Sequence, residues 1–304
     1  MRLFSICSIT LGLLAASSAF VIPQTTPTSP LALRAGAIDG SPPELLAPPD
    51  LYAKAATLGA AKGDSSSSKI FKLAMMSGAH IGFGAYLALT IGGACPGLAA
   101  SNPGLQKLIF GAFGLPFGLM LTLATGGELF TGNTLLLTSA LREGKTTLSK
   151  LRKSWITSYF GNLVGSLLLA YLVFTTKTLA GAAAPVAIAS SKCSMALLTA
   201  FTRGILCNYL VCLAVYMAAG CTSLASKMVA IWFPISAFVS MGLDHSVANM
   251  FIIPLGMMMG AEVTVGEFVA KNLIPVTLGN IVGGAGFVAM AYGSAFGKKK
   301  KVSE

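Results

Sequence analysis

The sequence predicts an all-α membrane protein with six transmembrane helices in two inverted repeats of three, with the second and fifth helices broken. Of its 304 residues, 54% are hydrophobic and only 10% are charged, and the mean hydropathy is +0.76. Soluble domains carry about 25% charged residues, so this composition is that of a membrane protein. Six apolar segments reach the roughly 20 residues that a membrane span needs. They cover about 72–95, 107–141, 153–176, 194–219, 228–260 and 271–295.

The N-terminal sequence predicts a leader in two parts. Residues 1–19 have the layout of a signal peptide, because one early arginine precedes an apolar run that ends in small residues. Residues 20–63 are rich in Ser, Thr, Pro and Ala and are expected to form a transit peptide and disordered linker. The junction ASSAFVIP resembles the leaders of algae with secondary plastids and predicts a plastid envelope location. The alternative is an ordinary secretory signal, with the plasma membrane as the destination.

The remaining chain is predicted to be one transmembrane domain, 64–296, followed by a basic tail, 297–304. Lysines and arginines gather in the loops on the side of both termini, which the positive-inside rule assigns to the cytoplasm or stroma. The net charge of +11 does not indicate nucleic-acid binding, because the basic residues are dispersed between apolar spans. The expected surroundings are therefore membrane lipid.

The second and fifth apolar segments are too long for one simple helix, and both contain polar interruptions. The second contains GGELFTGN (126–133) and the fifth contains GLDHSVAN (242–249). Each interruption has glycine, an acid and an asparagine. Charged groups at bilayer depth are costly and mark functional sites by default.

Two features recur at nearly one offset and predict an internal repeat. Glu128 and Asp244 are 116 residues apart, while Asn162 and Asn280, in FGNLVG and LGNIVG, are 118 apart. A duplicated unit of three spans gives two antiparallel copies, and such inverted repeats with broken helices form transport sites at the breaks. The shared GN[LI]VG pattern is interpreted mainly as a helix-packing face of small residues.

The sequence shows no sign of an enzyme or a metal site. Its six cysteines form no CxxC pair and no cluster with histidine, and are interpreted as small buried hydrophobic residues. Because no nucleophile–base pair is visible, we predict neither catalysis nor a cofactor.

Four ordered segments resemble the signatures of the formate/nitrite transporter family. They are GGELFTGNTLLL (126–137), RGILCNYLVCLAVYMA (203–218), DHSVANMFIIPLGM (244–257) and NLIPVTLGNIVGG (272–284). The resemblance covers about residues 72 to 295. It implies an aquaporin-like six-helix protomer, a homopentamer and one substrate pore in each protomer.

The resemblance also implies roles for individual residues. His245 corresponds to the central pore histidine, and Thr131 and Asn208 correspond to polar partners near it. Asn249 belongs to the same break, and Lys192 corresponds to a vestibule lysine that attracts anions. The two apolar constrictions are expected at Leu115, Leu119, Leu129, Phe130 and Phe238.

The acids in the two breaks, Glu128 and Asp244, are interpreted as structural acceptors for backbone groups that the breaks set free. Asp244 departs from the family pattern, which has glutamate at this position, so its shorter side chain puts fine selectivity in doubt. Arg203 has two interpretations that stay open: a pore charge, or a snorkelling or carboxylate-paired residue.

The expected function is transport of small monovalent anions, nitrite first and formate next, coupled to protons through His245. Nitrite comes first because a plastid location would connect nitrite made in the cytosol to its reduction in the plastid. One alternative is bicarbonate transport by the same fold. Another is a neutral-solute channel of aquaporin type. Such channels have two NPA motifs, which are absent here; the only Asn-Pro pair in the sequence is Asn102-Pro103, in a loop.

Overall fold

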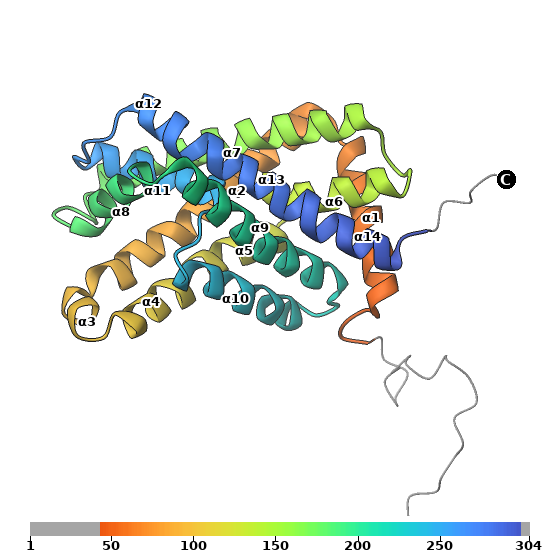
Figure 1. Cartoon of the computed structure of the whole chain (residues 1–304), viewed down its shortest axis with the longest axis horizontal. Coiled ribbons are helices and arrows are strands. Elements are labelled where there is room, and N and C mark those ends of the chain that lie inside the picture. Colours follow the sequence, from red (N-terminus) through yellow and green to blue (C-terminus); the bar gives the residue numbers. More distant parts are fainter. Residues whose placement is uncertain (1–42, 299–304) are drawn as a thin grey trace, which may run out of the picture.

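The computed structural model describes residues 43–298. The regular secondary structure of this part of the chain is helical, apart from one isolated β-bridge between Leu45 and Cys221, and loops and turns connect the helices (Figure 1). In chain order its elements are α1 (Pro48–Asp64), α2 (Ser67–Ile91), η1 (Gly92–Ala94), α3 (Pro96–Ser101), α4 (Pro103–Ala112), α5 (Leu115–Ala124), α6 (Phe130–Arg142), α7 (Leu148–Thr176), α8 (Ala183–Cys193), α9 (Leu197–Gly220), α10 (Leu224–Ser240), α11 (Ser246–Met258), α12 (Val265–Glu267), η2 (Phe268–Leu273), α13 (Ile274–Ile281), η3 (Val282–Ala289) and α14 (Met290–Phe296). The segments η2 and η3 are π-helical turns within the last span.

Within the described residues, five helical runs are long and apolar enough to cross a membrane. They are Ser67–Ala94, Pro103–Ala124, Leu148–Thr176, Leu197–Gly220 and Val265–Phe296. The shorter apolar helices α10 and α11 follow one another where the fifth span was predicted. The all-helical membrane fold predicted from the sequence is therefore confirmed.

The two predicted breaks are present, and a glycine makes each of them possible. One lies between the end of α5 and the start of α6 and contains Gly126, with φ of 79°. The other lies between α10 and α11 and contains Gly242, with φ of 73°. These left-handed conformations are costly for residues that carry a Cβ. As a result α6 and α11 both begin inside the bundle (Figure 1).

The GN[LI]VG pattern does form a close-packed helix face, as predicted. A Cβ atom added to Gly165 would lie 1.9 Å from the carbonyl oxygen of Met75, so α7 lies directly against α2. In the other half, a Cβ on Gly279 would lie 2.1 Å from the carbonyl oxygen of Phe201, so α13 lies directly against α9. Small residues allow this close approach of helix backbones.

Helix α1 corrects the prediction of a disordered linker over residues 20–63. Its residues Leu51, Tyr52, Ala55 and Ala56 are buried, and α1 packs against α6 and α9. These positions form a helical stripe, but it is short and interrupted by polar residues, so composition alone masked it. The predicted start of the domain at residue 64 is therefore too late. The predicted signal peptide and residues 20–42 of the predicted transit peptide lie outside the described residues, as do tail residues 299–304.

The bundle has two different ends (Figure 1). Helices α1 and α14 lie at one end, which we name the α1 end, and α3 and α8 lie at the other, which we name the α8 end. The two breaks lie between these ends, and they carry the candidate site.

Candidate functional site

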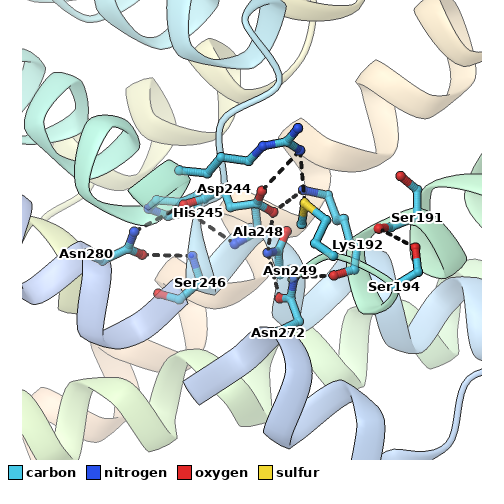
Figure 2. Close-up of polar contacts among 12 residues, drawn as sticks. Ser191, Lys192, Ser194, Asp244, His245, Ser246, Ala248, Asn249, Asn272 and Asn280 are labelled. Atoms are coloured by element: carbon cyan, nitrogen blue, oxygen red, sulfur yellow. Dashed lines mark hydrogen bonds and ion pairs between the residues drawn. The ribbon is translucent and has the colours of Figure 1, made fainter. Parts of the chain in front are cut away.

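The break before α11 holds a buried carboxylate, that of Asp244, which is fully shielded from solvent. Its Oδ1 accepts hydrogen bonds from Lys192 Nζ at 2.5 Å and from Asn249 Nδ2 at 3.0 Å (Figure 2). Lys192 lies in the last turn of α8, and only 17% of its side chain is exposed. A buried charge needs such partners because its desolvation costs several kcal/mol.

The break before α6 repeats this arrangement at the α1 end. Glu128 is buried, its Oε1 lies 2.9 Å from Lys62 Nζ, and its Oε2 accepts a hydrogen bond from Asn133 Nδ2 at 2.8 Å. Lys62 lies in the last turn of α1. This lysine was not predicted from the sequence because α1 was assigned to the linker. Lys62 and Lys192 are 130 residues apart, an offset longer than the 116 and 118 residues between the other repeated features, so the repeat did not point to Lys62 either.

Two asparagines close the breaks by the same three hydrogen bonds. In the first half, Asn162 Nδ2 donates to the carbonyl oxygens of Ala74 and Glu128, and its Oδ1 accepts the backbone N–H of Phe130.

In the second half, Asn280 Nδ2 donates to the carbonyl oxygens of Gly204 and Asp244, and its Oδ1 accepts the backbone N–H of Ser246 (Figure 2). Both asparagines were interpreted from the sequence mainly as part of a packing face. The structure gives them the further role of satisfying backbone groups that a broken helix leaves unpaired.

His245 and Thr131 meet between the two breaks, as the family resemblance implied. His245 is only 3% exposed, and its Nε2 lies 2.8 Å from Thr131 Oγ1. Its Nδ1 accepts the backbone N–H of Ala248 at 3.1 Å, so the imidazole caps the N-terminus of α11. Because Nδ1 is an acceptor, the proton of the neutral ring lies on Nε2 and is donated to Thr131. The threonine hydroxyl can then donate its own proton to a third group.

A narrow apolar cavity of about 10 Å³ lies beside the imidazole. That volume has room for about one water molecule. Four of the residues expected at the constrictions line it. The lining consists of Ile81, Leu115, Leu119, Leu129, Val211, Ile235, Phe238 and His245. A hydrated ion cannot pass such a cavity without losing its water.

Phe130 is not among the residues that line this cavity, and its expected place at one of the two constrictions stays a prediction. Its ring packs edge-on against the rings of Tyr159, at 5.0 Å, and Trp155, at 6.3 Å. These contacts pack the first residue of α6 against α7.

Among the described residues, the side chains of Asn208 and Asn249 hydrogen bond to groups around the site and not to the imidazole. Asn208 Nδ2 donates to the carbonyl oxygens of Thr131, at 3.3 Å, and Asn280, at 2.6 Å, while its Oδ1 is buried without a partner among the described residues. Asn249 bonds to Asp244 and also donates to Asn272 Oδ1 at 2.8 Å (Figure 2). Neither asparagine lines the cavity.

The two oxygens of the Asp244 carboxylate have different surroundings. Its Oδ2 is buried and accepts no hydrogen bond from the described residues. Arg203 of α9 faces that oxygen, with its Nη1 4.0 Å away. The aspartate thus has Lys192 and Asn249 as partners through Oδ1 and the more distant Arg203 through Oδ2.

Comparison with known proteins identifies a family. A family model described as formate/nitrite transporter matches residues 49–294. The probable formate transporter of Methanothermobacter thermautotrophicus is 41% identical over 268 residues, which are 81% of this chain and 95% of that protein. The formate channel FocA of Escherichia coli is 33% identical over 83% of this chain and 95% of its own length.

Solved structures agree with these relatives. An FNT family ion channel superimposes with a TM-score of 0.74 at 31% identity, covering 81% of this chain and 98% of that one. A pentameric formate channel with formate bound superimposes with a TM-score of 0.69 at 35% identity, covering 76% and 98%. The family match begins at residue 49 and so includes α1.

Proposed function

Since the chain belongs to the formate/nitrite transporter family, we propose that it moves small monovalent anions of weak acids, nitrite and formate, across a membrane together with a proton, through a pore in which His245 is essential to the coupling. The chain is a multi-pass membrane protein, and membership in a family of transporters confirms that it is not an enzyme. The observation that carries the proposal is the Thr131–His245 hydrogen bond beside an apolar cavity.

The apolar lining favours passage of a neutral species. A bare anion would lose its hydration in a cavity of about 10 Å³ that offers no cation. Burying an unpaired charge is far more costly than burying a neutral polar group. Nitrite and formate can each take up a proton and become a small neutral acid, so protonation removes most of this cost.

The two ends of the bundle supply the attraction that gathers anions before they are protonated. Lys192 and Lys62 lie at the α8 end and the α1 end, each beside one buried acid. The amino termini of α11 and α6 also point into the breaks, and helix amino termini favour negative charge. Fields of this kind raise the local concentration of a counter-ion.

The hydrogen bonds of His245 favour a neutral imidazole during transport. A proton added to Nδ1 would set two donors against each other, because that nitrogen already accepts the N–H of Ala248. We therefore propose that the anion takes its proton from vestibule water. The Nε2–H of His245 and the hydroxyl of Thr131 then guide the acid through the cavity. The rival route has an imidazolium give its own proton to the anion.

The order of substrates rests on two kinds of support. The names of the relatives in Methanothermobacter and Escherichia coli support formate. Nitrite as the first substrate, and a plastid envelope location, rest on the leader sequence, which lies in residues outside the described part. Assembly as a homopentamer is supported by the likeness to a pentameric formate channel.

The test compares uptake of nitrite, formate and bicarbonate by the purified protein in liposomes, with the external pH varied between about 5 and 8 around the usual histidine pKa. We expect uptake of nitrite and formate to rise as the external pH falls. His245→Phe should lose this uptake, while His80→Phe, which changes the other histidine, should keep it. Retention of proton-coupled uptake by His245→Phe would contradict the proposal. Water or glycerol flux without anion flux would instead identify a neutral-solute channel.

A further variant separates the two proton routes. Glutamine at position 245 can donate a hydrogen bond but cannot carry a proton. If the imidazole stays neutral, His245→Gln keeps proton-coupled uptake at a reduced rate. If the imidazolium delivers the proton, the same variant loses the coupling as fully as His245→Phe.

A further inference from the structure

We propose that Arg203 forms a second anion-binding group at the α8 end and selects planar anions that present two oxygen atoms. The inference rests on the proposed transport of small anions and adds a determinant of their selection. Arg203 lies in the second turn of α9, and 44% of its side chain is exposed.

The position of Arg203 is set by the pair formed by Lys192 and Asp244. Its Nη1 lies 4.0 Å from Asp244 Oδ2, beyond hydrogen-bond distance, and 3.0 Å from the Sδ atom of Met195. That carboxylate oxygen is buried and has no hydrogen-bond partner in residues 43–298. The guanidinium is therefore attracted electrostatically to the carboxylate but does not hydrogen bond to it.

The guanidinium keeps most of its donors available. It carries five N–H groups in a planar fork. Within the part of the chain that the structure describes, its contacts with other side chains are made through Nη1. A thioether sulfur is a weak acceptor. Donors on Nε and Nη2 are thus left for a ligand.

The cluster formed by Lys192, Arg203 and Asp244 has an excess of positive charge that one monovalent anion would balance. Lys192 and Arg203 each contribute one positive charge, and Asp244 contributes one negative charge. Nearby, Lys271 is paired with Glu267 at 2.8 Å, so that pair adds no net charge. A monovalent anion beside Arg203 and Lys192 would make the cluster neutral.

The geometry of arginine suits some anions better than others. A guanidinium can donate two parallel hydrogen bonds to two oxygens on one central atom, whereas an ammonium acts as a point charge. Formate and nitrite both have this shape. Fluoride, also the anion of a weak acid, offers a single atom. The α1 end has no equivalent guanidinium, because the position 130 residues before Arg203 is Leu73.

The test uses the full-length protein in liposomes and separates shape from charge. Arg203→Lys keeps the charge and removes the fork, while Arg203→Gln removes both. Arg152→Lys, on the exposed surface of α7, is the matched control. Initial uptake of formate and nitrite is measured over a range of concentrations, and uptake of fluoride at low concentration, each corrected for protein-free liposomes. Size-exclusion chromatography confirms that each variant keeps the wild-type assembly.

We expect Arg203→Lys to raise the KM for formate and nitrite about tenfold, a change equivalent to about 1.4 kcal/mol, with kcat retained. Fluoride uptake should stay at or above the wild-type level. Arg203→Gln should weaken uptake of every transported anion, and Arg152→Lys should change nothing. A formate KM within twofold of wild type in Arg203→Lys would overturn the inference. An equal loss of formate and fluoride uptake would also overturn it, because it would indicate a structural role. A wild-type protein that transports none of these anions would instead overturn the proposed function itself.

Discussion

The hydroxyl of Thr131, in the first half of the chain, hydrogen bonds to His245, in the second half. Replacing that hydroxyl tests how much this hydrogen bond contributes to transport. Thr131→Val keeps the size of the side chain but removes the partner of Nε2. A buried donor left without an acceptor costs about 1–3 kcal/mol, so we expect formate uptake to fall by about ten- to a hundredfold. Stopped-flow uptake into liposomes measures the change. Thr202→Val, at an exposed threonine of α9, should leave uptake intact, and equal losses in both variants would refute a specific role for Thr131.

The buried pair of Lys192 and Asp244 allows a second residue-scale prediction. Asp244→Asn leaves the Lys192 ammonium without its counter-charge, and breaking a buried pair on one side costs about 3–5 kcal/mol. We expect a clear drop in the thermal unfolding temperature of the detergent-solubilised protein. The double variant Asp244→Asn with Lys192→Met should recover part of that loss, because it removes the unpaired charge as well. Additive losses would mean that the two side chains do not interact.

Cys193 in α8 should be chemically inert at neutral pH. Its burial, together with the nearby carboxylate of Glu267, raises the pKa of its thiol to about 11. A raised pKa keeps the thiol protonated below that pH, and only the thiolate reacts with maleimides. We expect partly exposed Cys95 to be labelled at pH 7–8 while Cys193 is spared, with labelling of Cys193 increasing only in more alkaline solution. Peptide mass spectrometry reads both sites, and equal labelling at neutral pH would contradict the expectation.

At the scale of elements, each broken helix depends on one asparagine from the third span of its own half. Asn280→Leu fills a similar volume but leaves the N–H of Ser246 and the carbonyl oxygens of Gly204 and Asp244 without that partner. Each unsatisfied buried group costs about 1–3 kcal/mol, so the variant should unfold at a markedly lower temperature. Ser294→Ala, in the exposed last turns of the same span, serves as the control. An unfolding temperature equal to that of the control would show that the bonds of Asn280 do not hold the break.

The sequence predicted the breaks because an acid and an asparagine beside glycine are costly in an apolar span unless the helix is interrupted there. The meeting of Thr131 with His245 followed from the family resemblance. The sequence did not predict α1, whose buried stripe of Leu51, Tyr52 and two alanines is brief and lies beside prolines. It also did not predict that the ring of Phe130 packs against Trp155 and Tyr159 of α7, because such contacts depend on how two helices pack together. The partners of Asp244 depend on packing between distant segments, and no local pattern encodes them.

At the scale of the whole molecule, the polar contacts that close each break come from the same half of the chain. The loop after α7 separates the two sets of residues. The break before α6 is closed by residues that precede this loop, namely Lys62, Glu128 and Asn162. The break before α11 is closed by residues that follow it, namely Lys192, Asp244 and Asn280. Each half therefore contains what it needs to form its own broken helix. The contact between Thr131 and His245 is one of those that join the halves.

This division predicts that the protein can be made in two pieces. A cut after residue 180 falls in the loop that contains Gly181, whose φ is 76°, between α7 and α8. We expect fragments 1–180 and 181–304, expressed together, to copurify and to support formate uptake. Each fragment expressed alone should fail to do so. Two fragments that both reach the membrane without associating would contradict the self-sufficiency of the halves.

The correspondence between the lysine of α1 and the lysine of α8 extends the repeat from three spans to a unit that also includes a preceding short helix. A chain of that length, made as a separate protein, would have had to insert into the membrane in both directions so that two copies could pair head to tail. Joining the copies fixed their ratio at one to one and freed each copy to diverge. Arg203 and Leu73, which precede the matching acceptors Gly204 and Ala74, mark a position at which the two halves differ.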